Sequence, residues 1–341
     1  MKKIVLIGAL SFLAACGAGD IEETPAGQMP TLEAQQAIEQ LIEEPQLDLQ
    51  TYDEELEYIL VTHFSGETYV PLNPQRLVVF DMGAFDSLDY LGLGYRVVGT
   101  PTIDLTPILE QYSDVTNVGT MHEPNLEILV QLDPDLIIIM GRARPMFDEL
   151  TQIAPTLDFG LRNTHFLEDF RRNNYYLGRI FELEERVEEI LSEIDTLIEE
   201  TASILEDFEK EALIVMYNNG ALSAFGPGSR FGGLVHDDLG VPYVDAGIEI
   251  IGHGMIISNE YIVDQNPDIL FVIDRGAWAR SGSVVMDIND FENELVRLTT
   301  AYQTGNITYL DSVIWYVAPG GLQGVRSQIE EVREAVLNAL Y

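Results

Sequence analysis

An internal repeat constrains the fold of this chain more than any other feature of its sequence. A glutamate, a Pro-Asp pair and an arginine recur at the same spacing, with apolar residues between them, in two segments 133 positions apart. Each copy predicts a short amphipathic helix, a Pro-Asp turn that ends it, and an apolar strand typical of a buried parallel sheet. The repeated residues are Glu127, Pro134, Asp135 and Arg142 in the first copy and Glu260, Pro267, Asp268 and Arg275 in the second.

Two α/β lobes follow from this repeat. Another apolar run lies upstream of each copy, at residues 77–80 and 212–216, and a further run covers 307–310. Each upstream run opens an alternation of strand and helix patterns. The sequence therefore predicts an N-terminal lobe over 51–165 and a C-terminal lobe over 208–341.

The segment between the lobes, residues 166–207, has the pattern of a long helix. It is dense in glutamate, and its apolar residues recur every three to four positions, as in residues 183–191. We expect a rigid helix that joins the lobes at a nearly fixed separation. A ligand would then bind in the crevice between them.

The N-terminus has the pattern of an export signal. Lys2 and Lys3 precede an apolar run at residues 4–13 that is too short to span a bilayer, and Ala14 and Ala15 stand before Cys16, the only cysteine. We predict a signal peptide over 1–16 with an acylated Cys16, then a flexible acidic tether over 17–50. The folded part is expected outside the cytoplasm, anchored by lipid to a bacterial membrane, either in a periplasm or on the outer face of the cell membrane.

The charge of the chain limits its partners. With 18 Lys+Arg against 57 Asp+Glu, the formal net charge is -39. Such a surface argues against nucleic-acid binding, and against membrane contact other than through the lipid anchor, because phosphate recognition depends on basic residues. An anionic ligand would therefore need a locally basic pocket.

Three arginines are candidates for that pocket. Arg142 and Arg275 follow the two repeated strands, and ligands of open α/β sheets bind beyond the carboxyl ends of the strands. Arg230 lies in the glycine-rich loop Gly226-Pro-Gly-Ser-Arg-Phe-Gly-Gly233, which could face the same crevice. That loop is a weak nucleotide signal, since it lacks the Lys-Ser/Thr of a P-loop, and it contains no G-x-S-x-G nucleophile motif.

Histidines and aromatic residues supply two further candidates. The five histidines form no H-E-x-x-H pair, which makes a catalytic zinc site or an all-protein metal cage unexpected. His253 stands between two glycines that leave its imidazole accessible. Tyr316 follows Trp315 in a loop after the last strand pattern, and on sequence alone both residues favour packing roles.

Together these segments resemble the substrate-binding lipoproteins of ferric-siderophore ABC transporters, and the similarity covers the chain from about Glu57. The branch most similar captures catecholate siderophores such as petrobactin, and tetradentate bis-catecholates. The resemblance implies two α/β lobes joined by a rigid helix. The segments that carry it are Phe80-Asp-Met-Gly-Ala-Phe-Asp-Ser-Leu-Asp-Tyr-Leu-Gly, Val118-Gly-Thr-Met-His-Glu-Pro-Asn-Leu-Glu, Phe225-Gly-Pro-Gly-Ser-Arg-Phe-Gly, His253-Gly through Asp274-Arg275, and Trp315-Tyr316.

The resemblance also implies roles for single residues. The three arginines would contact catecholate oxygens, with Arg144 close enough to Arg142 to leave that assignment open between the two. A histidine and a tyrosine would complete the iron coordination of a tetradentate complex, but would make only outer contacts to a hexadentate one. One acidic residue on each lobe would dock to the membrane permease. The matching positions are Arg142, Arg230 and Arg275 for the ligand, His253 and Tyr316 for the metal, and Glu127 and Glu260 for the permease.

The sequence thus predicts a monomeric, lipid-anchored protein that binds a ferric catecholate siderophore and delivers it to an ABC importer. No catalytic turnover and no intrinsic cofactor are expected, since the iron(III) siderophore is the ligand. Haem, cobalamin and hydroxamate siderophores remain alternative ligands. An extracytoplasmic α/β hydrolase and a structural lipoprotein remain alternatives of other classes.

Overall fold

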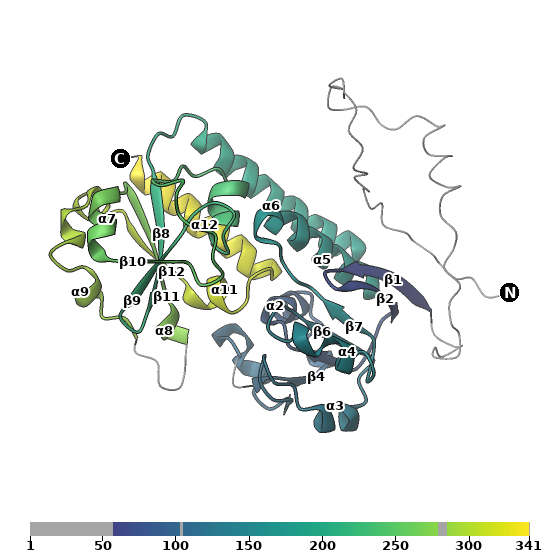
Figure 1. Cartoon of the computed structure of the whole chain (residues 1–341). Helices are drawn as coiled ribbons and strands as arrows, with labels where there is room; N and C mark the ends of the chain where they lie inside the picture. The colour runs from purple at the N-terminus through teal and green to yellow at the C-terminus, as the bar shows by residue number, and fades with distance from the viewer. Residues whose placement is uncertain (1–56, 103–104, 279–284, 341) are drawn as a thin grey trace, which may run out of the picture.

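The computed structural model describes residues 57–102, 105–278 and 285–340. The predicted signal peptide, Cys16 and the tether over 17–50 lie outside these residues. The described chain forms two α/β lobes, one drawn at the lower right of Figure 1 and the other at the left. The predicted fold class is confirmed.

The N-terminal lobe is built on a five-stranded parallel sheet of order β5-β4-β3-β6-β7. Apolar strands form its centre, because β3 and β6 are buried on both faces. A separate antiparallel hairpin, β1–β2, precedes the sheet and was not predicted. The strands of this lobe are β1 Tyr58–His63, β2 Gly66–Pro71, β3 Leu77–Val79, β4 Val97–Thr100, β5 Thr116–Asn117, β6 Leu136–Ile139 and β7 Thr156–Asp158.

Helices cover both faces of this sheet. α2 (Met82–Tyr90) begins at Asp81, whose side chain accepts a hydrogen bond from the backbone N–H of Gly83. α2 packs in the apolar core on one face, and α3 (Leu126–Leu132) and α4 (Phe147–Leu150) lie over the other face.

The C-terminal lobe has a mixed sheet of order β10-β9-β8-β11-β12. β8, β11 and β12 are parallel, whereas β9 returns antiparallel to β8 through a turn at Asn219 and Gly220, both with positive φ. Its elements are β8 Ala212–Asn218, β9 Ala221–Phe225, β10 Met255–Ile257, α7 Asn259–Gln265, β11 Ile269–Asp274, α8 Arg275–Trp278, α9 Ile288–Phe291, α10 Thr300–Gln303, β12 Ile307–Leu310, α11 Ser312–Tyr316 and α12 Leu322–Ala339.

The internal repeat forms equivalent structures in the two lobes. α3 and α7 both end at a residue in the left-handed region, Asp133 and Asn266, types that tolerate positive φ. The aspartate of each Pro-Asp pair then accepts hydrogen bonds from backbone N–H groups just before the neighbouring central strand. Asp135 binds the N–H groups of residues 75 and 76 before β3, and Asp268 binds that of Glu211 before β8.

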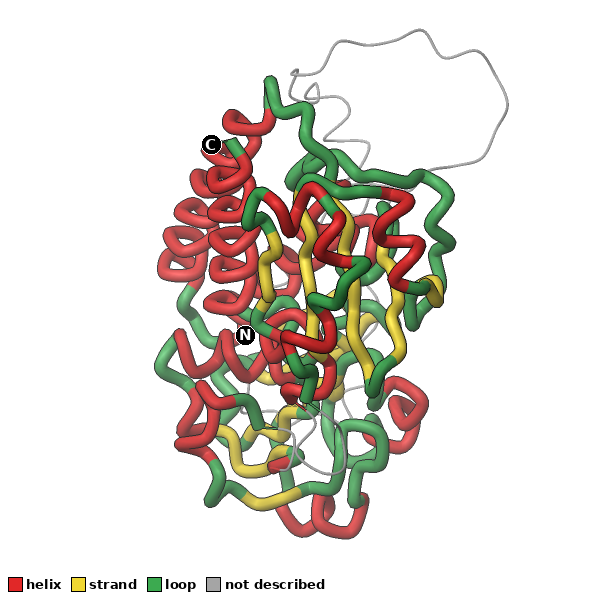
Figure 2. The backbone as a smooth tube through the Cα atoms, turned by 90° about the vertical axis from the view of Figure 1, so that its left-hand side faces the viewer, coloured by secondary structure: helices red, strands yellow, loops and turns green. Residues whose placement is uncertain are grey.

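Two helices connect the lobes where the sequence predicts a single one. α5 (Phe166–Ile180) and α6 (Glu184–Leu205) are separated by a break in which Glu182 has a φ of 57°. The start of α5 packs in the core of the C-terminal lobe and its end in that of the N-terminal lobe. α6 lies beside α12, with ion pairs such as Arg326–Glu193 between them (Figures 1 and 2).

The lobes also touch directly, where α2 meets the start of α12. Asp86 in α2 accepts the backbone N–H groups of Gln323 and Gly324, at 3.0 and 3.2 Å. At Gly83 the approach is close enough that a Cβ atom would lie 2.1 Å from the carbonyl oxygen of Pro319. These contacts join α2 of the N-terminal lobe to the start of α12 in the C-terminal lobe.

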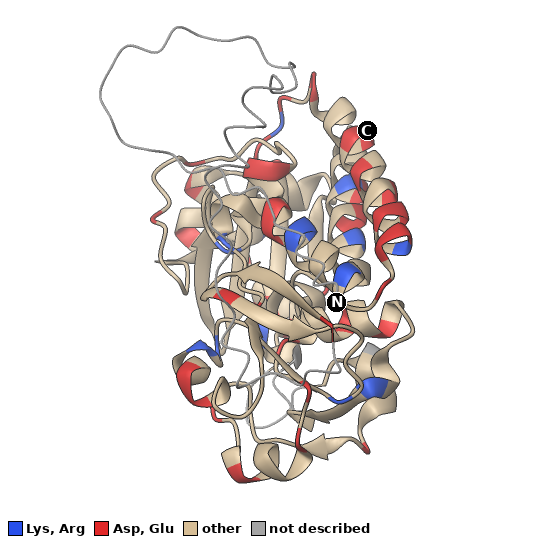
Figure 3. Ribbon diagram, turned by 90° about the vertical axis from the view of Figure 1, so that its right-hand side faces the viewer, with Lys and Arg blue, Asp and Glu red and all other residues tan. Residues whose placement is uncertain are grey.

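Acidic residues outnumber arginines along α6 and α12, and ion pairs such as Arg326–Glu193 and Arg333–Glu200 join the two helices (Figure 3). Among the described residues, no helix has both the length and the apolar character needed to cross a membrane.

Candidate functional site

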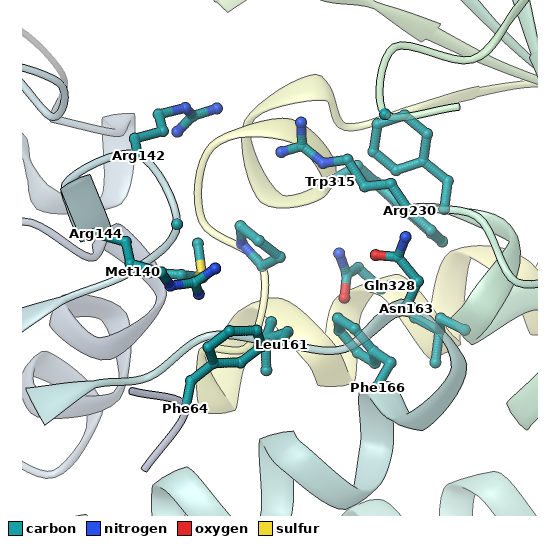
Figure 4. A pocket seen from close by; sticks show the side chains of 15 residues that line it. Phe64, Met140, Arg142, Arg144, Leu161, Asn163, Phe166, Arg230, Trp315 and Gln328 are labelled. Carbon is teal, nitrogen blue, oxygen red and sulfur yellow. The ribbon is translucent and has the colours of Figure 1, made fainter. Parts of the chain in front are cut away.

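A cavity of about 400 Å³ opens between the two lobes (Figure 4). Both lobes and the connecting segment contribute to its wall. The lining combines guanidinium groups, amides and apolar side chains, a mixture typical of small-molecule sites. The lining residues are Phe64, Met140, Gly141, Arg142, Arg144, Leu161, Asn163, Phe166, Arg230, Phe231, Leu234, Gly252, Trp315, Pro319 and Gln328.

The topology of the sheets explains where this cavity lies. In each lobe the chain runs from the central strand to one side and then crosses to the other, so that β3 and β6, and likewise β8 and β11, flank a switch in strand order. Arg142 follows β6 and Arg275 follows β11. The repeated arginines thus stand at equivalent switch points, as predicted.

Three arginines from the two lobes meet around one aromatic ring. The guanidinium carbon of Arg230 lies 4.4 Å from the ring centroid of Tyr316, and those of Arg142 and Arg275 each lie 5.4 Å from it. Arg142 and Arg230 also donate hydrogen bonds to the carbonyl oxygen of Tyr316. We call Arg142, Arg230 and Arg275 the arginine cluster.

The arginine cluster has no carboxylate partner among the described residues, although the chain carries 57 acidic residues. Burial and the neighbouring charges of Arg142 and Arg275 lower the pKa of Arg230 to about 10. Positive charge is therefore concentrated here without an ion pair from the described part of the chain, and only a weaker Coulombic interaction joins Arg142 to Asp81. Such a site favours a bound anion.

The arginine cluster lowers the pKa of the Tyr316 phenol. Burial by itself would raise its pKa, but the charges of Arg230, Arg275 and Arg142 outweigh burial, so that the pKa is lowered. A hydrogen bond from Arg275 acts in the same direction. Tyr316 is therefore the centre of the cluster and not simply the packing residue that its sequence context favours.

Arg144 differs from Arg142 although it lines the same cavity. Its guanidinium donates to both carboxylate oxygens of the fully buried Asp158, with Nη2 to Oδ1 at 3.2 Å, and lies 3.7 Å from the ring centroid of Phe64. Its charge is thus neutralised inside the N-terminal lobe. The geometry therefore favours Arg142, and not Arg144, as the arginine that the N-terminal lobe contributes to an anion site.

Trp315 combines packing with a place in the cavity wall. It is only 2 % exposed, its indole N–H donates to Glu331 at 2.6 Å, and its ring contacts Phe231 edge to face. The packing role expected from the sequence is present. Because part of the indole also lines the cavity, its fluorescence can report on an occupant.

His253 does not lie on the cavity wall. It is exposed in a turn, between Gly252, which lines the cavity, and Gly254, whose φ is +79°. A role as an iron ligand would therefore require this turn to move inward, and the prediction for His253 stays untested.

The two glutamates predicted to dock to a permease occupy matching places. Glu127 lies in the first turn of α3 and Glu260 in the first turn of α7, and both are exposed. Each lobe thus presents one carboxylate from the repeat. Their docking role stays a prediction.

Several cavity residues escaped the sequence analysis, among them Phe64, Asn163 and Gln328. Phe64 is carried by the tip of the unpredicted β1–β2 hairpin and is 42 % exposed. Asn163 belongs to the crossing segment before α5, and Gln328 to the apolar stripe of α12. For Gln328 a signal existed, because it occupies an inward position of an amphipathic helix.

Comparisons with known proteins agree with this architecture. A profile of the periplasmic binding protein family matches residues 77–314. The petrobactin-binding protein YclQ of Bacillus subtilis is 39 % identical over 83 % of this chain and 90 % of its own length. The ferric-anguibactin-binding protein FatB of Vibrio anguillarum is 32 % identical over 80 % of this chain and 86 % of its own.

Solved structures show the same relationship. The crystal structure of YclQ superimposes with a TM-score of 0.78 over 82 % of this chain and 99 % of that one. The periplasmic catecholate-siderophore binding protein VctP of Vibrio cholerae superimposes with a TM-score of 0.77 at 31 % identity, over 82 % of this chain and 100 % of that one. The family profile, the two relatives and the shared two-lobed fold together show that this chain belongs to the periplasmic binding protein family.

Proposed function

We propose that the protein binds a ferric catecholate siderophore in the cavity between its lobes and delivers it to an ABC importer. The observation that carries this proposal is the arginine cluster, which gathers three guanidinium groups from two lobes without a carboxylate partner among the described residues. The names of YclQ, FatB and VctP, which refer to petrobactin, ferric anguibactin and catecholate siderophores, support the same ligand class.

The chemistry of the cluster fits such a ligand. A ferric catecholate complex is strongly anionic, and planar guanidinium groups form charge-assisted hydrogen bonds to its oxygens without competing for the metal. Iron(III) is a hard cation that prefers anionic oxygen. A Tyr316 phenol with a lowered pKa would supply one such oxygen to a tetradentate complex, and His253 would supply a further ligand when its turn closes.

The remaining parts of the proposal concern location and delivery. Family membership supports an extracytoplasmic place for the folded lobes. We assign the membrane attachment to an acylated Cys16 and the permease contact to Glu127 and Glu260, one on each lobe. The relatives are named as binding proteins, which supports a carrier without catalytic activity, and we propose that this carrier acts as a monomer.

A fluorescence titration tests the ligand class. The chain lacking residues 1–16 is titrated with a ferric bis-catecholate, a ferric tris-catecholate and a ferric hydroxamate complex. Because the chain contains two tryptophans, a Trp278→Phe background leaves Trp315 as the reporter. Saturable quenching by a catecholate complex but not by the hydroxamate is expected. Quenching by the hydroxamate alone, or by haem or cobalamin in the same assay, would refute the proposed ligand.

The arginine cluster is tested in the same titration. Replacing Arg230 and Arg275 together by Ala should abolish saturable quenching by the catecholates. Arg297, an exposed arginine whose guanidinium lies over Tyr302 and away from the cavity, serves as the control position. Unchanged affinity in the double variant would place the ligand elsewhere.

A further inference from the structure

Gln328 is a buried residue of the cavity wall with an unused hydrogen-bond acceptor. It lies on α12, is 2 % exposed and lines the cavity between the lobes (Figure 4). Its buried Oε1 atom has no hydrogen-bond partner in the described part of the chain. Since buried polar groups are normally paired, an unpaired one in a ligand cavity calls for an explanation.

The orientation of the Gln328 amide is set by a neighbour. Its Nε2 donates to the carbonyl oxygen of Ile314 at 3.1 Å, in α11. Reversing the amide would place Oε1 against that carbonyl, and two acceptors repel each other. The nitrogen is therefore committed to Ile314, and the oxygen is left without a protein partner.

Only the part of a ferric siderophore outside its iron-binding oxygens can use the Oε1 acceptor of Gln328. Catecholate oxygens bound to iron are deprotonated and can only accept, so the arginine cluster can bind them but the Oε1 atom of Gln328 cannot. An N–H or O–H group elsewhere in the siderophore, such as an amide of the linker between catechols, is a donor that loses water when it enters the cavity. The binding free energy of such a donor is most favourable when it meets an acceptor that is already shielded from water.

We propose that Gln328 is a specificity residue, whose Oε1 accepts a hydrogen bond from an N–H or O–H donor of the siderophore outside its iron-binding oxygens. This inference rests on the proposed function and extends it from the iron-binding end of the ligand to its linker. It adds a neutral recognition element to a site otherwise described by charge.

Two matched probes test this role. One is a ferric bis-catecholate whose catechols are joined to a diamine through secondary amides, with the carbonyl attached away from the chelating oxygens so that the N–H is not used internally. The other is its N-methylated analogue, which has tertiary amides and no donor. Affinities are measured for the natural chain, Gln328→Met, and the control Gln152→Met, which alters an exposed glutamine on the surface of the N-terminal lobe.

The natural chain and Gln152→Met are expected to bind the secondary amide roughly tenfold more tightly than the tertiary amide. In Gln328→Met the two affinities should agree within about twofold. Because loss of the Ile314 contact would weaken both probes equally, the ratio isolates the hydrogen bond from any structural effect. The same ratio in Gln328→Met as in the natural chain would mean that the methyl groups act by steric hindrance, and would overturn the inference.

Two further outcomes separate this inference from the function on which it rests. Tight binding of both probes by the natural chain without discrimination would overturn the role of Gln328 alone, and would indicate that Oε1 is served by water. Failure of both probes to bind would overturn the proposed ferric-catecholate function, and the role of Gln328 with it.

Discussion

Replacing Arg230 by Gln should stabilise the protein without ligand while weakening ligand binding. Burial, and then the charges of Arg142 and Arg275, lower the pKa of Arg230 to about 10 from the ordinary 12.5. Since each pH unit corresponds to about 1.4 kcal/mol, the charged form is disfavoured by at most about 3 kcal/mol. The charge of Arg230 thus destabilises the protein without ligand, and a bound anion would offset this cost.

Part of this gain is lost with the contacts of the arginine. Its hydrogen bond to the Tyr316 carbonyl contributes about 1 kcal/mol, and its placement over the Tyr316 ring about 0.5–1 kcal/mol. The net stabilisation should be about 1–2 kcal/mol, or roughly 2–8 °C in Tm. Loss of a charge-assisted hydrogen bond should at the same time weaken ferric bis-catecholate binding roughly 10- to 100-fold.

Thermal unfolding without ligand and fluorescence titration with ferric bis-catecholate measure the two effects on the same samples. Arg297→Gln, at an exposed arginine outside the cavity, should change neither quantity. A lower Tm for Arg230→Gln together with unchanged affinity would refute the reasoning. That result would make Arg230 an ordinary structural residue and not a ligand-binding charge.

Three other predictions concern iron ligation, pH and delivery. Tyr316→Phe should weaken binding of the ferric bis-catecholate at least tenfold in the same titration and leave the affinity for a hexadentate tris-catecholate unchanged. Equal losses of affinity for both complexes would argue against iron ligation. Burial lowers the pKa of His63 to about 4, so its contribution to stability is complete above pH 6.5 and is lost as the pH falls toward 4. Urea unfolding at pH 7.5 and 4.5 measures how much the free energy of unfolding falls on acidification. This fall should be up to about 3 kcal/mol smaller in His63→Gln than in the natural chain, and an equal fall would refute the prediction. Glu127→Ala with Glu260→Ala should leave siderophore affinity unchanged but reduce iron uptake by cells, and normal uptake would contradict docking.

The lobes were predictable because their signals are local. Apolar runs bounded by turns mark the strands β3, β8 and β12, and the two Pro-Asp pairs separate helix from strand in both copies of the repeat. Arg142 could be placed at the cavity, and Arg275 at the matching strand end of the other lobe beside Tyr316, because the end of a parallel strand fixes where the next residue lies. Nothing beyond periodicity and spacing was needed.

What the sequence analysis missed depends on contacts distant in the chain. The position of Phe64 follows from backbone and side-chain bonds between the hairpin tip and Asp158, more than ninety residues later. The same carboxylate separates the role of Arg144 from that of Arg142. The connecting segment kept its helical periodicity through the break at Glu182, so that one helix was predicted in place of two.

The position of a bound iron tests the central claim most directly. Crystals of the chain lacking residues 1–16, grown with a ferric bis-catecholate, would be measured at the iron absorption edge. We predict one anomalous peak in the cavity between the lobes, in bonding contact with the Tyr316 hydroxyl, with the catecholate oxygens facing Arg142, Arg230 and Arg275. A peak outside this cavity, or a complex whose catecholates avoid all three arginines, would contradict the account.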